Sequence, residues 1–286
     1  MINNNIFQSI KAALSKDTTN SLTSEILKTE VGNTYTVRLL PNNKDVNKTF
    51  FHYYQHGWTS FATGQYVGAL SLQTFNERDP IAEERYRILR TGSDADKKKA
   101  ETIKRAEKWL VNVYVVNDPV TPENNGKVKI LRFGKQLHNI IMDAIEGDSA
   151  EDFGPRIFDL SPNGVNLKVK VEKQGEYPTF VSSKFSLPAE IKDLSEEKMK
   201  KVYESTFELD KVFQVRGVDD LKQMLAEHFH CVDTKPVATV TEEVETPAPV
   251  ATAKTKTPAP KAAPKTVPTD DEDEVEKLLS DLEITR

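Results

Sequence analysis

The segment from Asp233 to Thr269 constrains most strongly what this chain can fold into. It is built mainly from Thr, Pro, Ala, Val and Lys and contains no aromatic residue. Proline fixes φ and lacks a backbone N–H, so closely spaced prolines prevent regular helix or sheet; they include Pro247, Pro249, Pro258, Pro260, Pro264 and Pro268. We expect a disordered linker over residues 233–269, which confines the folded core to residues 21–232.

An acidic segment follows the linker. Residues 270–284 hold eight acids and one lysine, a local charge of −7, beginning with Asp270, Asp271, Glu272, Asp273 and Glu274. Apolar residues then recur at the i, i+3, i+4 and i+7 spacing of an amphipathic helix: Val275, Leu278, Leu279 and Leu282. The pattern predicts a partner-binding tail over residues 270–286, with a solubilising tail as the alternative. The residues after Asp233 carry seven bases and eleven acids, so without them the net charge of −5 falls to −1.

Several classes of protein are excluded by what the sequence lacks. Cys231 is the only cysteine, so neither an intramolecular disulfide nor a multi-cysteine zinc site is possible. No apolar run approaches the roughly 20 residues of a membrane helix, and residues 1–16 lack the order of a secretory signal. The five histidines match no nucleophile, zincin or phosphate-loop pattern. We expect a cytoplasmic binding protein without cofactor, metal or membrane partner, and not an enzyme.

Alternating and β-branched apolar stretches predict that the core is mainly β. Strands are expected over residues 34–40, 49–56, 109–116, 127–133 and 165–171, and helices over 80–90, 95–108, 135–146, 195–207 and 218–229. Five short strands with inserted helices are typical of a partly open antiparallel barrel. The expected fold class is therefore α+β, mainly β, with a five-stranded OB-fold core and helical insertions.

A basic hairpin is the most informative stretch of the core. Asn125-Gly126 predicts a tight turn in which both residues have positive φ. The strand after it carries four bases and no acid: Lys127, Lys129, Arg132 and Lys135. Bases this close repel one another unless an anion faces them. They indicate a phosphate-binding surface, with a solvated outer strand face as the alternative.

A second group of bases leads directly into an aromatic residue, Trp109. On the helix expected over residues 95–108, one side carries Lys104, Arg105 and Lys108. A further aromatic pair, Tyr177 and Phe180, flanks a proline in an expected surface loop. Cations that hold phosphates beside aromatic faces that stack bases are what a single-strand groove requires. The alternative for the aromatic pair is a lid over the core.

Several motifs, in this order, resemble one protein family. They are Val37-Arg38-Leu39-Leu40-Pro41, Val115-Val116-x-Asp118-Pro119, Pro122-Glu123-Asn124-x-Gly126-Lys127-Val128, Arg132-Phe133-Gly134-Lys135, Leu167-Lys168-Val169-Lys170 and Ser183-Lys184-Phe185. Over residues 30–185 the chain resembles the T-even-type bacteriophage single-stranded DNA-binding, or helix-destabilising, protein family. The resemblance implies an OB-fold core that coats single strands without sequence specificity during phage DNA replication, recombination and repair.

The resemblance also implies individual DNA-binding residues and partners. Basic positions of the family pattern, including its DNA cleft, and an aromatic pair beside that cleft correspond to Arg38, Lys104, Arg105, Arg132, Tyr177 and Phe180. Trp109 falls where the family has a Tyr next to a Trp. The acidic tail implies recruitment of a helicase loader, a recombination mediator and a polymerase in the cytoplasm of an infected bacterial host. The alternative is a replisome scaffold in which interactions of the tail dominate.

Two departures from the family pattern alter these expectations. The family's best-known members bind zinc with one His and three Cys, whereas here only His56 remains and residues 58–86 lack cysteine. We expect residues 58–86 to form a zinc-free replacement of that subdomain, closed by packing of Phe61, Tyr66, Leu70, Leu72 and Phe75. The family's N-terminal arm carries a compact basic run that drives self-association, but residues 1–20 offer only Lys11 and Lys16. This second departure weakens the expectation that the protein self-associates through its N-terminal arm.

Overall fold

The structure is a computed structural model that describes residues 22–175 and 177–232. The expectations for the N-terminal arm, the 233–269 linker and the 270–286 tail fall outside the described residues and stay predictions. Across the part of the chain that is described, no helix has the length and apolar character needed to cross a membrane.

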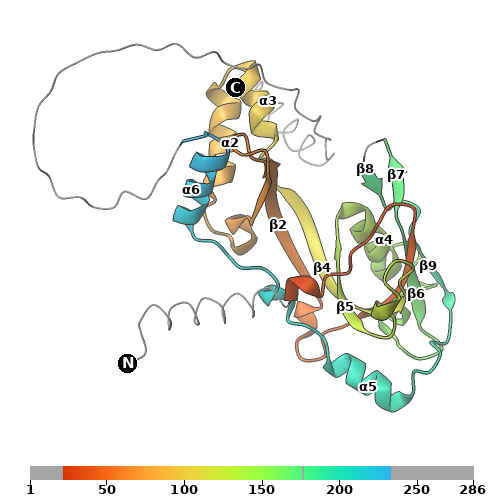
Figure 1. The fold of residues 1–286 in the computed structure, drawn as a ribbon. Coiled ribbons are helices and arrows are strands. Elements are labelled where there is room, and N and C mark those ends of the chain that lie inside the picture. The colour runs from red at the N-terminus through yellow and green to blue at the C-terminus, as the bar shows by residue number, and fades with distance from the viewer. Residues whose placement is uncertain (1–21, 176, 233–286) are drawn as a thin grey trace, which may run out of the picture.

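An antiparallel sheet of seven strands forms the centre of the fold (Figure 1). Its strands are β1 (Thr34–Leu40), β2 (Phe50–Thr59), β3 (Tyr66–Leu70), β4 (Ala106–Asn117), β5 (Val128–Phe133), β6 (Val165–Lys170) and β9 (Lys184–Pro188). They pair in the order β3-β2-β4-β1-β6-β9, and β5 pairs with β4 off this path. A separate two-stranded ribbon pairs β7 (Glu172–Gln174) with β8 (Tyr177–Thr179).

Helices lie around this sheet and between its strands (Figure 1). The α-helices are α2 (Pro80–Thr91), α3 (Asp94–Glu101), α4 (Lys135–Glu146), α5 (Glu196–Glu204) and α6 (Val218–His228), and short 3₁₀ helices occupy Val46–Lys48, Leu72–Phe75, Pro122–Asn124, Gly154–Phe158 and Leu209–Lys211. The expected α+β class with a mainly antiparallel sheet is confirmed. Among the described residues the strand path runs from β3 to β9 without closing, so the five-stranded OB barrel stays a prediction.

β4 contributes to the main core. Successive side chains of a strand point to opposite faces, so every second residue of β4 lies on the core face. One face carries the buried residues Trp109, Val111, Val113 and Val115, which pack with apolar residues of β1, β5 and β6. α4 covers this face with the apolar stripe expected from the sequence. Its buried and partly buried residues are Leu137, Ile140, Ile141, Ala144 and Ile145.

A second core lies in the lobe that contains α2, α3 and α6 (Figure 1). Its buried residues include Trp58, Leu72, Ile81, Ile88, Ile103, Leu221, Met224 and Phe229. The expectation that Tyr66 and Phe75 help to close residues 58–86 is wrong, because both are exposed, Tyr66 to 70%. Phe61 is also exposed, but its ring meets the buried Phe229 ring edge-on at a centroid distance of 5.7 Å. α6, distant in the sequence, supplies apolar cover that the local pattern could not reveal; Leu70 and Leu72 are buried as expected.

The helix expected over residues 95–108 is wrong in its second half. α3 ends at Glu101 and β4 begins at Ala106, because residues 106–111 pair with residues 50–55 of β2. Cross-strand pairing overrides the helical charge pattern of this stretch. No common helix face is therefore shared by Lys104, Arg105 and Lys108.

The connection between β4 and β5 differs from the expected tight hairpin at one residue. Gly126 has the positive φ that was expected, +80°, whereas Asn125 has φ −59° and ψ 133°. These values describe a type II turn, closed by a hydrogen bond from Lys127 N–H to the Asn124 carbonyl oxygen of 3.1 Å. The Asp118 carboxylate braces the loop by accepting from the Thr121 N–H and the Asn124 side-chain amide.

Candidate nucleic-acid interface

β2 and β4 bring aromatic rings together at one end of the sheet. His52 and Trp109 are direct partners in the antiparallel register, and their rings stack with centroids 4.9 Å apart. His138 of α4 stacks on the same indole, with centroids 4.1 Å apart. His52 is exposed, so this group presents an aromatic ring to solvent.

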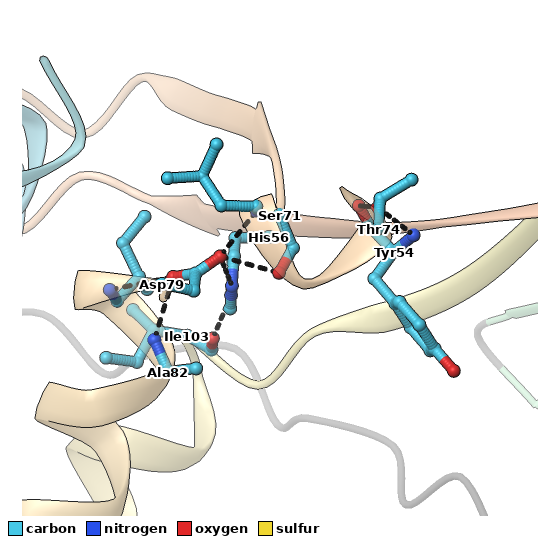
Figure 2. A network of polar contacts seen from close by, with 9 residues as sticks. Tyr54, His56, Ser71, Thr74, Asp79, Ala82 and Ile103 are labelled. Carbon is cyan, nitrogen blue, oxygen red and sulfur yellow. Dashed lines mark hydrogen bonds and ion pairs between the residues drawn. The ribbon is translucent and has the colours of Figure 1, made fainter. Parts of the chain in front are cut away.

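Tyr54 extends the group along β2. Its ring meets His52 edge-on at a centroid distance of 5.0 Å, and the Arg105 guanidinium lies over the Tyr54 ring, 4.3 Å from its centroid. The Tyr54 ring points away from the buried polar residues that flank it (Figure 2). A cation on one ring beside a second ring combines attraction for phosphate with a stacking face for bases. We call the following five residues the β2–β4 aromatic surface: His52, Tyr54, Arg105, Trp109 and His138.

One carboxylate lies within this surface. Glu107 Oε1 is 2.7 Å from His52 Nε2, and both side chains are partly exposed. A carboxylate repels a phosphate, so the Glu107 charge opposes binding of a polyanion at this position. A protonated His52 cancels that charge within the pair.

Trp109 offers little of its own ring to a ligand. Its side chain is only 8% exposed and contacts the rings of His52, Phe133 and His138. The expectation that bases stack directly on Trp109 conflicts with this burial. The indole instead supports His52 and His138 from beneath.

Arg38 lies in the interior, and the expectation that it contacts DNA is wrong. Its side chain is 0% exposed. The guanidinium donates to Asn166 Oδ1 at 3.0 Å and to the backbone oxygens of Asp159, Ser161 and Ala189 at 3.0, 2.9 and 2.8 Å. Arg38 therefore joins β1 to the loops around β6 and β9.

α4 positions the predicted aromatic pair. Gln136 Oε1 accepts a hydrogen bond from the Phe180 N–H at 2.8 Å, and Phe180 packs partly buried against the main core. Its ring therefore serves as a lid, whereas Tyr177 in β8 is exposed. Lys135 is exposed at the first residue of α4. Tyr177 and Lys135 thus lie toward the end of α4 that carries His138.

The hairpin bases lie away from the aromatic surface. Phe133 is opposite Trp109 in the β4–β5 register, so Lys127, which immediately precedes the far end of β5, lies about 20 Å away at ~3.4 Å per residue. Lys129 Nζ is 2.8 Å from a Glu25 carboxylate oxygen. Lys129 therefore forms an ion pair with the segment that precedes β1. Lys127 is exposed.

The remaining two predicted bases are on the reverse face of the sheet. Lys108 is paired with Tyr53, and Arg132 is paired with Leu110. Tyr53 and Leu110 are both buried on the side of the sheet that Trp109 does not face. Strand alternation therefore brings Lys108 and Arg132 to one face but separates them from the aromatic surface.

A buried polar network joins the second lobe to β2 (Figure 2). Asp79 is the N-cap of α2, and its Oδ1 accepts from the first N–H groups of that helix. Its Oδ2 accepts from the Ser71 hydroxyl at 2.6 Å and lies 3.2 Å from His56 Nε2. His56 Nδ1 is 2.8 Å from the Ile103 carbonyl oxygen. Both His56 nitrogens thus face acceptors, and the doubly protonated ring satisfies both.

This network makes residues 58–86 unsuited to zinc. Burial alone raises the pKa of Asp79, but the hydrogen bond and charge of His56, with the Ser71 hydroxyl, hold that pKa well below its usual value. His56 and Asp79 therefore form a buried hydrogen-bonded pair. No group of three or more His, Cys, Asp or Glu side chains that could hold a metal occurs among the described residues. The donor set that a structural zinc requires is not assembled here.

Sequence reasoning missed three members of the surface. His52 and Tyr54 are two residues apart on β2, and His138 is the fourth residue of α4. Alternation along residues 49–56 could have placed His52 and Tyr54 on one face, because the strand itself was expected. Their position opposite Trp109 depends on the strand register, which the sequence alone does not specify.

The match to a sequence family decides how this surface is interpreted. Residues 32–229 match the family described as gp32 DNA binding protein like. The chain belongs to this family. It is 27% identical over 165 residues to the single-stranded DNA-binding protein of Enterobacteria phage T4 and, equally, to the protein of that name from Enterobacteria phage T2. The alignment covers 58% of this chain and 54% of each relative, so the chain spans about half the length of the curated relatives it matches.

These findings confirm the resemblance to the T-even-type family that the motifs indicated. The family is one of DNA-binding proteins and not of enzymes, in agreement with the expectation from the sequence. The matched range begins two residues before β1 and ends just after α6, so it includes both lobes.

Proposed function

We propose that this protein binds single-stranded DNA without sequence specificity and coats it during phage DNA replication, recombination and repair in the infected bacterial cytoplasm. The observation that carries the proposal is the β2–β4 aromatic surface, where Arg105 lies over Tyr54 beside the exposed ring of His52. The relatives named single-stranded DNA-binding protein support it. The sheet that carries the surface is proposed to be an elaborated OB-fold.

The proposed mechanism divides the single strand between two kinds of contact. Lys104 and Arg105 attract the phosphates, and unstacked bases lie on the rings of His52, Tyr54 and Tyr177. Base–aromatic stacking contributes about 1–3 kcal/mol per base and tolerates any base, because every base has a π-face. Duplex DNA keeps its bases stacked inside, so the same surface discriminates against it.

A titration with poly-dT and with duplex DNA at two salt concentrations tests this function. We expect tighter binding of poly-dT and a log–log salt dependence with a slope of about −0.7 for each phosphate neutralised. Equal affinity for duplex would overturn the proposal. Magnesium-dependent cleavage of a labelled strand would instead indicate a nuclease.

Protein partners are proposed for the termini. The acidic residues Asp270–Glu274 and the apolar residues Leu278, Leu279 and Leu282 are proposed to recruit a helicase loader, a recombination mediator and a polymerase. Residues 1–20 are proposed to support self-association on DNA. The alternative remains a replisome scaffold whose main activity is tail-mediated.

A further inference from the structure

Two cations approach each other on the reverse face of β4 and β5. Lys108 and Tyr53 are paired between β4 and β2, while Arg132 and Leu110 are paired between β5 and β4. Because Lys108 and Leu110 are two residues apart on one strand, all four side chains point to the same face. Lys108 and Arg132 are therefore diagonal neighbours there.

No acid compensates this pair in the part of the chain that the structure describes. Neither Lys108 nor Arg132 has an ion pair with a carboxylate there. Burial lowers the pKa of Lys108, and the positive charge of Arg132 lowers it further. Arg132 is nevertheless exposed and Lys108 is half-buried, so an anion from solvent can reach both. Two cations held together at the edge of a core are stabilised when an anion binds between them.

A buried hydroxyl lies at the same place. The Tyr53 side chain is 0% exposed, and its hydroxyl has no hydrogen-bond partner within the described residues at ordinary hydrogen-bond geometry. Burial raises the pKa of Tyr53, although the nearby Arg132 guanidinium opposes that rise. The hydroxyl therefore stays protonated and has a proton to donate. A buried polar group without a partner destabilises the fold, but this hydroxyl is enclosed and does not itself reach a ligand.

The backbone of Gly134 lies beside Lys108. A Cβ built on Gly134 would be 3.7 Å from Lys108 Nζ, an ordinary van der Waals distance. Gly134 is also the N-cap residue of α4 and provides no side-chain cap. The first N–H groups of α4, next to the cations, add to the positive potential. β5 ends at Phe133, opposite Trp109, so β4 has no β5 partner at Lys108.

We propose that Lys108 and Arg132 form a subsite for one backbone phosphate of the single strand, beside the buried Tyr53 and on the face of β4 opposite the aromatic surface. The strand then passes over the open edge of β4 at Gly134, between stacked bases on one side and this phosphate on the other. The inference rests on the proposed function and adds a path for the strand.

Charge-neutral variants of the full-length protein test the cations. Lys108→Gln and Arg132→Gln should each weaken binding of oligothymidylate roughly tenfold at low salt and reduce the salt slope by about 0.7. Lys222→Gln is the matched control, because Lys222 lies exposed on α6 and pairs with Asp219. Variants with the wild-type slope would overturn the subsite.

A second experiment locates the phosphate. One uncharged methylphosphonate linkage is moved along the oligothymidylate, and wild type should lose affinity at a discrete position. That loss should disappear in Lys108→Gln, because the contact is already absent. An equal loss in both proteins at every position would contradict a single phosphate at Lys108.

Tyr53→Phe separates ligand binding from folding. Because the hydroxyl is buried, the variant should bind oligothymidylate with wild-type affinity while it unfolds at the same or a higher urea concentration than wild type. A several-fold loss of affinity would contradict a subsite formed by the two cations alone. If wild type itself fails to prefer single strands, the proposed function fails; if it prefers them and both Lys108→Gln and Arg132→Gln bind like wild type, only this inference fails.

Discussion

Arg105 is the residue whose position most directly implies a phosphate contact. Arg105→Gln removes one charge from the aromatic surface while leaving a side chain that can lie over Tyr54. We expect weaker binding of all single-stranded sequences alike and a salt slope reduced by about 0.7, the value for one phosphate on a single strand. Fluorescence titrations at several salt concentrations measure both, with Lys222→Gln as control. An unchanged slope would remove Arg105 from the phosphate contacts.

Glu107 gives the opposite prediction. Glu107→Gln deletes the negative charge 2.7 Å from His52 and keeps the side-chain shape. Affinity for oligothymidylate should rise several-fold at low salt, and the gain should fade as salt screens the surface. Glu146→Gln, an exposed acid at the last residue of α4, controls for the change in net charge. A gain of equal size in both variants would show that only net charge matters.

The sequence shows which side chains are charged, but it did not show which of them are exposed. Lys104, Arg105 and Lys135 remain partly or fully exposed, as a binding role requires. The sequence predicted that Arg38 is another exposed base. In the structure its guanidinium instead donates to four backbone and side-chain acceptors in the interior. These acceptors come from residues 159–189, more than a hundred positions later, so no local pattern could have shown the burial.

Helices and strands with a strong hydrophobic periodicity were predictable from the sequence, whereas those that depend on pairing with another strand were not. β1 and α4 have the bounds that alternation and the helical apolar stripe predicted. β3 and β9 were missed because they are short edge strands whose pattern is weak without their partners β2 and β6. The same cause explains the wrongly predicted helix over residues 102–108, because pairing with β2 places residues 106–108 in β4. The site depends on this register, and so its composition was only partly predictable.

Asp79 determines whether α2 and the second lobe stay attached to β2. Asp79→Asn removes the carboxylate that faces His56 in the interior and weakens the helix cap. Breaking one side of a buried pair costs about 3–5 kcal/mol, whereas Ser71→Ala should cost only about 1–3 kcal/mol for one lost hydrogen bond. Urea unfolding compares the two variants. Equal losses would mean that the charge of Asp79 adds nothing beyond its hydrogen bonds.

The same carboxylate predicts part of the acid response of the fold. Its pKa is lowered in the folded protein, so the stability it contributes is fully present above the unfolded value of about 3.9. That stability is lost as the pH falls through this value toward the lower folded one. Stability measured against pH should therefore fall more steeply in wild type than in Asp79→Asn below about pH 4. Parallel curves would contradict a lowered pKa of Asp79.

At the scale of the whole molecule, the charge of the chain is divided between its parts. The residues after Asp233 bring the net charge from −1 to −5, and the −7 of residues 270–284 has the same sign as a DNA backbone. The expected linker of 37 residues spans roughly 30–35 Å as a random coil and more with its prolines. On this expectation the acidic segment reaches basic residues of the core.

Deleting residues 270–286 tests whether that reach is used. If the acidic segment competes with DNA for the cations of the core, the truncated protein should bind oligothymidylate more tightly at low salt, and this gain should vanish as salt rises. It should also lose association with the phage replication proteins.

Full-length protein with Leu278→Ala, Leu279→Ala and Leu282→Ala is the matched control. It keeps every acid, so its DNA affinity should stay at the wild-type value while partner binding is lost with the apolar stripe. An unchanged affinity and unchanged partner binding after truncation would reduce the tail to a solubilising segment. Partner binding that survives the triple substitution but not the truncation would assign recruitment to the acids instead of the leucines.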